Sequence, residues 1–184
     1  MSGSGWTSTS MPYLTPRAPG AGDAWTEEAA EAGRRGSQRI TRAGEAPAPA
    51  AVAAMLDLAE GSAVVVRRRI IELDGQPTEL TDTYYPSEIA AGTPLAGAAR
   101  IRGGAVTLLA ALGHVGVRVV ENVTARMPGD EEREQLRLGT AEPVLQLART
   151  TYDAAGRAIQ ADVMVMPAGR QQLRYEIGIG IGIG

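Results

Sequence analysis

The sequence predicts an α+β fold in which helices pack on an antiparallel sheet. Stretches with hydrophobic residues at helical spacing alternate with stretches of period two, which is typical of strands. Two pairs of the period-two stretches are separated by short turns and predict β-hairpins. A unit made of one helix and one hairpin also occurs twice along the chain, which indicates two similar halves joined in one sheet.

Size and composition limit the classes of protein that this chain can belong to. It has 184 residues, and 44% of them are hydrophobic, which suits one domain with a short appendage. All 18 basic residues are arginine, against 21 acidic residues, so the formal net charge is −3 and the sequence pI is about 5.3. This balance excludes a chain-wide basic surface for nucleic acid.

Several kinds of site are excluded by missing residue types. The chain has no cysteine, no lysine and one histidine, so it has no disulfide, thiolate zinc site, Walker-type lysine, Schiff base or histidine cluster. We expect no cofactor and no metal. No segment approaches the ~20 apolar residues of a membrane span, and the first residues do not resemble a signal peptide. We therefore expect a cytoplasmic protein with no membrane partner.

The N-terminal part divides into an arm and a linker. Residues 1–22 are rich in Gly, Ser, Thr and Pro, which predicts a flexible arm or an artificial leader. Asp23 predicts the N-cap of a helix that ends at Gly33, and this helix with a first strand forms a linker over 23–46. The main domain then covers 47–177, and 178–184 form a low-complexity tail with no assigned function.

The elements of the main domain follow from periodicity and turn residues. The first helix places Val52, Met55, Leu56 and Ala59 on one face, and residues 86–102 are expected to form a loop. His114 follows a helix-ending glycine and is expected at the surface or in a cap. The predicted elements are a helix over 47–61, a hairpin over 63–86 turning at Asp74-Gly75, a helix over 103–113, a strand over 115–127, a helix from Asp130 to 138, a hairpin over 143–167 turning at Ala155-Gly156, and a strand over 172–177.

A weak internal duplication is the most informative feature. The two copies are offset by 80 residues, or by 81 after one insertion. A crevice between two such halves is a natural place for a ligand. The matched positions are Leu56/Leu136, Leu58/Leu138, Val64/Val144, Arg69/Arg149, Gly75/Gly156, Tyr85/Met166 and Pro86/Pro167.

Strand alternation indicates which face would bind a ligand. In the last hairpin strand one face is apolar (Ile159, Ala161, Val163 and Val165) and the other is mixed (Gln160, Asp162, Met164 and Met166). A mixed face suits a binding pocket, with a half-exposed sheet as the alternative. The equivalent face of the first hairpin carries Arg67, Arg69, Ile71, Glu79, Thr81, Thr83 and Tyr85.

Three consecutive arginines are the strongest charged feature of the first hairpin. Arg67 and Arg69 share a face and are suited to hold an anionic ligand through two parallel hydrogen bonds. An ion pair between Arg69 and Glu79 or Asp82 of the neighbouring strand is an equally good interpretation.

The order of elements and three segments resemble the UTRA domain, the effector-binding half of HutC-type regulators in the GntR family. The resemblance covers residues 36–177, and residues 25–40 look like the segment that joins the DNA-binding and UTRA domains in actinobacterial members. It implies a chorismate lyase-like fold with a sheet of about six strands, dimerisation through this domain, and DNA contact only through a winged helix-turn-helix. No such motif precedes the matched region, so we expect the C-terminal portion of a regulator or a free-standing sensor. The segments are RRRIIELDGQPTELTDTYYP, GGAVTLLAALG and VLQLARTTYDAAGRAIQADVMVMPAGRQQLRYE.

The residues at the family's ligand positions indicate an unusual effector. Members that sense amino-sugar phosphates carry seven polar residues there, and only Arg69 keeps its type in this chain. A phosphate would lose most of its donors. We therefore expect a medium-sized organic metabolite, with an apolar pocket and a few polar anchors, rather than a sugar phosphate. The other six positions are Ile71, Thr81, Gly104, Val106, Gln160 and Met166.

The leading hypothesis is a sensor domain that binds a small-molecule effector and, as a homodimer, modulates DNA binding by attached winged helix-turn-helix domains. The rivals are a small chorismate lyase-like enzyme and a purely structural dimerisation module; we expect no enzymatic activity and no catalytic residues. The predicted ligand-binding residues are Arg67, Arg69, Ile71, Thr81, Thr83, Tyr85, Gly104, Val106, Gln160, Asp162, Met164 and Met166.

Overall fold

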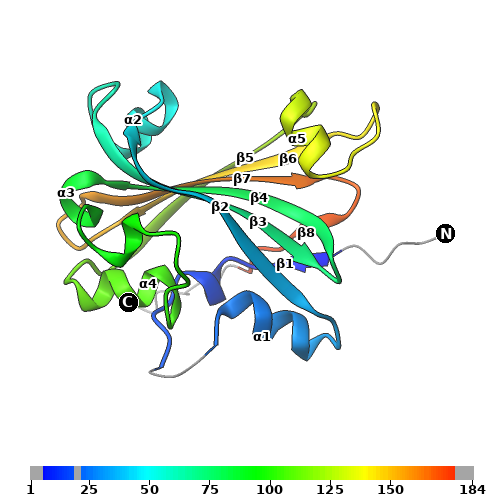
Figure 1. Cartoon of the computed structure of the whole chain (residues 1–184), viewed down its shortest axis with the longest axis horizontal. Coiled ribbons are helices and arrows are strands. Elements are labelled where there is room, and N and C mark those ends of the chain that lie inside the picture. The colour runs from blue at the N-terminus through cyan, green and yellow to red at the C-terminus, as the bar shows by residue number, and fades with distance from the viewer. Residues whose placement is uncertain (1–5, 19–21, 177–184) are drawn as a thin grey trace, which may run out of the picture.

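A six-stranded antiparallel sheet with the strand order β2-β3-β4-β7-β6-β5 crosses the centre of the molecule (Figure 1). The computed structural model describes residues 6–18 and 22–176. The α+β prediction with an antiparallel sheet of about six strands is confirmed. The strands are β2 (Gly36–Pro47), β3 (Ala63–Leu73), β4 (Gln76–Pro86), β5 (Arg118–Arg126), β6 (Val144–Tyr152) and β7 (Ala158–Pro167).

The helices cover both faces of this sheet. Helices α2 (Ala50–Leu56) and α5 (Asp130–Gln135) lie above it in Figure 1, and α1 (Ala24–Glu31) and α4 (Gly104–Ala111) lie below it. The upper core joins α2 to β3, β4 and β7, and the lower core joins Leu109 of α4 to Val65 and Tyr85. The lower side also carries β1 (Trp6–Ser8), which pairs in parallel with β8 (Gln171–Leu173).

The internal duplication appears in the sheet as approximate two-fold symmetry. Each half has the order strand, helix, hairpin: β2-α2-β3-β4 in the first half and β5-α5-β6-β7 in the second. The halves meet where β4 pairs with β7, and β2 and β5 lie at the two edges. The sequence indicates a repeat of one helix and one hairpin. In the structure each repeat also includes the strand before the helix, β2 or β5.

Both predicted hairpins are present, and backbone geometry explains the first turn. Asp74 and Gly75 have φ angles of 52° and 77°. Two successive positive φ angles fit a type I′ turn, whose twist matches the flanking strands. At the N-cap of α1, the Asp23 side chain accepts a hydrogen bond from the Thr26 backbone N–H, as its place before the helix predicts.

Three local predictions are wrong. Helix α2 ends at Leu56 because Asp57 adopts a left-handed φ of 55°, so Ala59 lies outside the helix. The expected loop after β4 contains the short helices α3 (Ser87–Ala90) and η2 (Pro94–Ala96). A bulge in the β6–β7 pairing moves Ile159 onto the face of Tyr85 and Leu109, away from Ala161.

Strand β5 is shorter and more exposed than its valine pattern suggests. Pairing begins at Arg118 instead of residue 115, and β5 pairs with β6 alone within the described chain. Val117, Val123 and Met127 are 62%, 43% and 52% exposed. The apolar face of this strand is therefore not part of the core.

Ordered elements also occupy residues that composition assigns to a flexible arm. Besides β1, a 3-10 turn, η1 (Met11–Tyr13), lies in this segment. The ring of Trp6 meets that of Trp25 edge to face, with centroids 5.1 Å apart. The predicted tail over 178–184 lies outside the described residues. None of the described helices is long and apolar enough to cross a membrane.

Candidate functional site

A cavity of about 180 Å³ lies on the lower face of the sheet, between the sheet, α1, the start of α4 and the N-terminal segment 6–17. Both halves of the sheet contribute to it, since its lining includes residues of β3, β4, β6 and β7. Its apolar lining residues are Trp6, Pro12, Tyr13, Ala24, Trp25, Ile71, Ala105, Val106 and Met164. Its other lining residues are Ser8, Thr15, Arg17, Asp23, Gln38, Arg69, Thr78, Glu79, Gly103, Gly104, Arg149 and Gln171.

Arg69 is the cavity arginine without a carboxylate partner in the described part of the chain. Its guanidinium donates to the neutral oxygens of Gln38 and Thr83, at 3.4 and 3.1 Å. Its Nε is buried and has no hydrogen-bond partner among the described residues. A buried donor left unpaired costs about 1–3 kcal/mol.

Arg149 occupies the equivalent position in the second half and is neutralised. Its Nε donates to the Glu121 carboxylate at 2.6 Å, and its Nη2 donates to the Ser10 hydroxyl at 2.9 Å. Burial raises the pKa of Glu121, but Arg149 and the hydrogen bonds outweigh it and hold the pKa below its ordinary value. The pair fixes one wall of the cavity and ties the N-terminal segment to β5 and β6.

Three aromatic rings line the opposite side of the cavity. Trp6 and Tyr13 come from the N-terminal segment, and Trp25 comes from α1. The Trp25 indole N–H donates to the Glu72 carbonyl oxygen at 3.0 Å, which fixes its ring against β3. The Tyr13 hydroxyl donates to Glu28; burial and this carboxylate raise the pKa of Tyr13, which keeps the phenol neutral.

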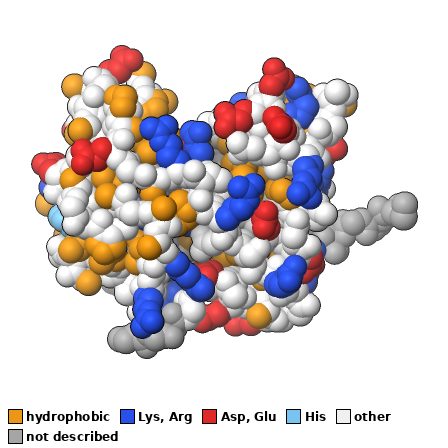
Figure 2. All heavy atoms as spheres, viewed as in Figure 1, with side chains coloured by type: hydrophobic (Ala, Val, Ile, Leu, Met, Phe, Trp, Pro, Cys, Tyr) orange, Lys and Arg blue, Asp and Glu red, His pale blue; other side chains and the backbone are white. Residues whose placement is uncertain are grey.

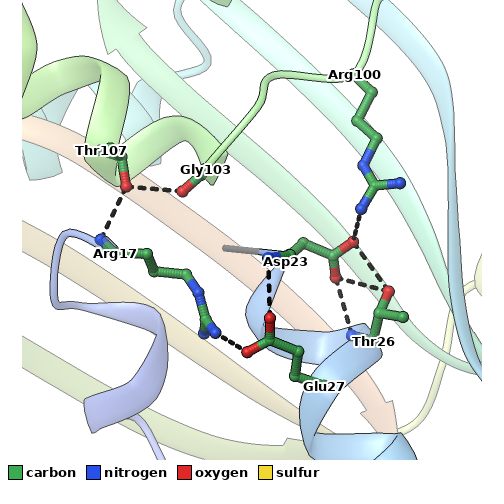
Figure 3. Close-up of polar contacts among 8 residues, drawn as sticks. Arg17, Asp23, Thr26, Glu27, Arg100, Gly103 and Thr107 are labelled. Atoms are coloured by element: carbon green, nitrogen blue, oxygen red, sulfur yellow. Dashed lines mark hydrogen bonds and ion pairs between the residues drawn. The ribbon is translucent and has the colours of Figure 1, made fainter. Parts of the chain in front are cut away.

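Polar contacts close the N-terminal segment over the start of α4 (Figure 3). The Arg17 backbone N–H donates to the Thr107 hydroxyl at 3.0 Å, and this hydroxyl donates to the Gly103 carbonyl oxygen at 2.7 Å. The Arg17 side chain pairs with Glu27, and Asp23 accepts from Arg100 at 2.8 Å. The first turn of α4 therefore lines a cavity whose rim is held by ion pairs.

Two further polar side chains face the cavity. Burial raises the pKa of Glu79, although the Thr81 hydrogen bond, Arg69 and Arg149 act in the opposite direction. No hydrogen bond or ion pair joins Glu79 to Arg69 among the described residues; the Glu79 carboxylate accepts from the Thr81 hydroxyl. Gln171 is 9% exposed; its amide nitrogen donates to the Thr78 carbonyl oxygen, whereas its Oε1 has no partner among the described residues.

The predicted site residues fall into two groups. Five line the cavity: Arg69, Ile71, Gly104, Val106 and Met164. The remaining seven lie outside the cavity lining: Arg67, Thr81, Thr83, Tyr85, Gln160, Asp162 and Met166.

Several residues outside the lining support it from behind. Thr83 receives the Arg69 hydrogen bond and donates to Asp162 at 2.7 Å, and Gln160 donates to Asp162 at the same distance. Arg67 differs from these residues, because its guanidinium donates to carbonyl oxygens of the loop at residues 94–99. Arg67 therefore holds a loop, and its donors face away from the cavity.

Sequence reasoning missed the aromatic side of the cavity. A segment of Gly, Ser, Thr and Pro reads as a linker, yet it carries Trp6 and Tyr13, and such residues are uncommon in flexible linkers. The sequence indicates Arg149 only as the duplicate of Arg69. Since both arginines line one cavity, this correspondence is the signal in the sequence that could have identified Arg149 as a site residue.

The opposite face of the sheet is also hollowed. Figure 2 shows a notch at the upper edge, between the two protrusions that α2 and α5 form in Figure 1. A smaller cavity of about 140 Å³ lies beside α5, and its charged residues are already paired, as in the contact of Arg68 with Asp82 at 2.7 Å. No group of three or more metal-ligating side chains occurs within residues 6–18 and 22–176.

Comparison with known proteins places the chain in a family. The family model of the UTRA domain matches residues 31–172. An HTH-type transcriptional regulator of Streptomyces coelicolor is 34% identical over 136 residues, which are 72% of this chain and 50% of the relative. The chain thus spans about half the length of that relative.

Solved structures agree with this placement. The effector domain of PhnF from Mycobacterium smegmatis superposes with a TM-score of 0.71 at 19% identity, over 84% of this chain and 94% of that domain. The ligand-binding domain of a Bordetella bronchiseptica protein assigned to the GntR family gives a TM-score of 0.67 at 25% identity, over 78% of this chain and 92% of that domain. The chain belongs to the UTRA domain family, and its relatives are transcriptional regulators of the GntR family.

Proposed function

We propose that this chain is the effector-binding part of a HutC-type regulator of the GntR family, and that a small organic molecule occupies the cavity beside Arg69. The observation that carries this proposal is Arg69, a cavity-lining arginine whose guanidinium contacts only neutral oxygens and has no carboxylate partner among the described residues. An uncompensated guanidinium costs folding free energy, and a ligand offsets that cost. The proposal assigns the chain no enzymatic activity.

The lining favours an effector other than a sugar phosphate. Positions where phosphate-sensing relatives carry polar side chains hold Ile71, Gly104 and Val106 here, and all three line the cavity. A phosphate would find one free arginine, whereas an apolar molecule with one polar group would match the surface.

Thermal unfolding of the chain against a panel of metabolites tests the proposal. Binding to the folded state raises stability by RT ln(1 + [L]/Kd), about 2.7 kcal/mol at 100-fold excess over Kd. We expect a saturable rise in melting temperature that weakens in Arg69→Ala. The matched control is Arg68→Ala, because Arg68 points to the other face and pairs with Asp82. No shift with sugar phosphates, organic acids or antibiotic-like metabolites would count against the sensor.

In the intact regulator we propose that the sensor works as a homodimer joined at β5. This edge strand exposes Val120 and Val123, with Val117 exposed directly before it, and an exposed apolar edge normally needs a cover. A second copy of β5 offers the same valines and a free edge, so the contact would be self-complementary. Sedimentation velocity should show that the wild type is a dimer, that Val123→Arg dissociates it, and that Ala54→Arg on α2 leaves it intact. A monomeric wild type, or a dimer that Val123→Arg does not dissociate, would contradict the assignment.

The effector would act by binding two arrangements of the dimer unequally, with a typical coupling of ~1–3 kcal/mol. The linker around Gly33–Gly36 lies between α1 and β2 and would pass the movement to an attached winged helix-turn-helix. Equal operator binding by the full-length regulator with and without saturating effector would refute switching. Release of pyruvate from chorismate would instead reveal the lyase-like alternative.

A further inference from the structure

The ligand's ring and its charge have separate contacts in the cavity. We propose that the effector is a small organic acid with one planar ring, whose carboxylate meets Arg69 and whose ring lies against Trp6, Tyr13 and Trp25. This inference rests on the proposed function and adds the chemical class of the ligand.

The planar ring follows from the aromatic side of the cavity. Trp6 and Trp25 meet edge to face at an interplanar angle of 74°, so two ring surfaces form a corner rather than a stack. Tyr13 lines the same space. Aromatic pairs favour offset-stacked and edge-to-face contacts, and a flat ring in this corner can make both kinds of contact.

The aromatic corner comes from outside the region that matches the family. The UTRA match begins at residue 31, whereas Trp6, Tyr13 and Trp25 all precede it. These residues therefore extend the lining of the pocket beyond the region that the family model matches.

The acid group follows from the unequal compensation of the cavity arginines. Arg17 pairs with Glu27 and Arg149 with Glu121, whereas Arg69 contacts only neutral oxygens among the described residues. A carboxylate is the planar acceptor that a single guanidinium binds best.

The size of the cavity limits the ligand to one ring. Its volume of about 180 Å³ is slightly larger than the ~150 Å³ of an engineered cavity that binds benzene. The space therefore suits a single ring with a carboxylate and one or two further atoms.

The chain carries its own reporter for the test. It has two tryptophans, Trp6 and Trp25, and both line the cavity, so intrinsic tryptophan fluorescence reports occupancy without background from other sites. The probes are benzoate, cyclohexanecarboxylate with a puckered ring, benzamide without a charge, and inorganic phosphate. We expect saturable binding of benzoate with a Kd on the order of 1 mM, which is usual for so small a molecule.

Preferences within each protein give the decisive comparison. In the wild type benzoate should bind about tenfold more tightly than benzamide and severalfold more tightly than cyclohexanecarboxylate, and phosphate should cause no saturable change. Arg69→Gln should lose the preference for charge, and Trp6→Leu, which keeps Trp25 as reporter, should lose the preference for the flat ring. Arg68→Gln should keep both the preference for charge and the preference for the flat ring. Because each preference is a ratio within one variant, a general loss of stability does not imitate the result.

Two outcomes would overturn the inference. One is absence of saturable benzoate binding, and the other is equal binding of the three organic probes. If another metabolite then shifts the melting temperature in an Arg69-dependent way, the sensor function stands and the ligand class is wrong. If none does, both proposals fail.

Discussion

The ion pair between Arg149 and Glu121 should be a main support of the cavity wall, and a double-mutant cycle can measure its contribution. The Nε to carboxylate distance is 2.6 Å, and the two side chains are 9% and 11% exposed. Removing one partner of a buried pair leaves a charge without compensation and typically costs 3–5 kcal/mol. Because both groups keep some access to water, we take the lower end, about 3 kcal/mol.

The cycle compares Arg149→Met, Glu121→Leu and the double variant. Each single substitution should lower the free energy of unfolding by about 3 kcal/mol, or the melting temperature by ~6–12 °C for a chain of this length. The double variant leaves no buried charge, so its loss should be about 2 kcal/mol smaller than the sum. Urea unfolding followed by circular dichroism measures all four proteins.

The matched control is Arg157→Met, which breaks the exposed pair with Glu88. Those side chains are 44% and 67% exposed, so the cost should stay within about 0.5 kcal/mol. Losses below about 1 kcal/mol for both single variants, or strictly additive losses, would refute the reasoning.

Three further predictions concern acid stability, the core and the charge of the cavity. The lowered pKa of Glu121 contributes stability that is present above its ordinary value of 4.5 and lost as the pH falls through the lower folded value, so acid titration should destabilise Glu121→Gln less steeply than the wild type; parallel curves would contradict this. Leu136→Ala removes a fully buried side chain beneath α5 and should cost 2–5 kcal/mol in urea unfolding, and a loss below about 1 kcal/mol would show that the site collapses. Ile40 lies opposite Arg69 on β2, so Ile40→Glu should give Arg69 a carboxylate partner and reduce carboxylate binding by tenfold or more, measured by tryptophan fluorescence; unchanged binding would mean that Arg69 does not hold the ligand.

The fold was largely predictable because its signals are local. The Asp74-Gly75 turn, the alternation along β3, β4 and β7, and the Asp23 cap each depend on residues within a few positions of one another. The errors arose where one backbone angle or one extra residue decided the outcome. The left-handed φ of Asp57 ends α2 earlier than predicted, and the bulge beside Thr151 places the Ile159 side chain on the other face of the sheet from the one predicted.

The cavity was only partly predictable because half of it depends on contacts between distant segments. Alternation alone places Arg69, Ile71 and Met164 on one face, and all three line the cavity. Ser10, in contrast, meets Glu121 and Arg149 across 111 and 139 positions of sequence. No periodicity within the N-terminal segment reports such contacts, so its composition led to the reading of a flexible arm.

Divergence between the two halves explains why a symmetric sheet has one charged binding position. Antiparallel pairing places Glu121 of β5 directly opposite Arg149, and in the first half it places Ile40 of β2 opposite Arg69. The same arginine, repeated in both hairpins, therefore has a carboxylate neighbour in one half and an apolar one in the other. The first arginine therefore lines the cavity without a carboxylate partner among the described residues, while the second fastens the N-terminal segment that brings Trp6 and Tyr13 to the site.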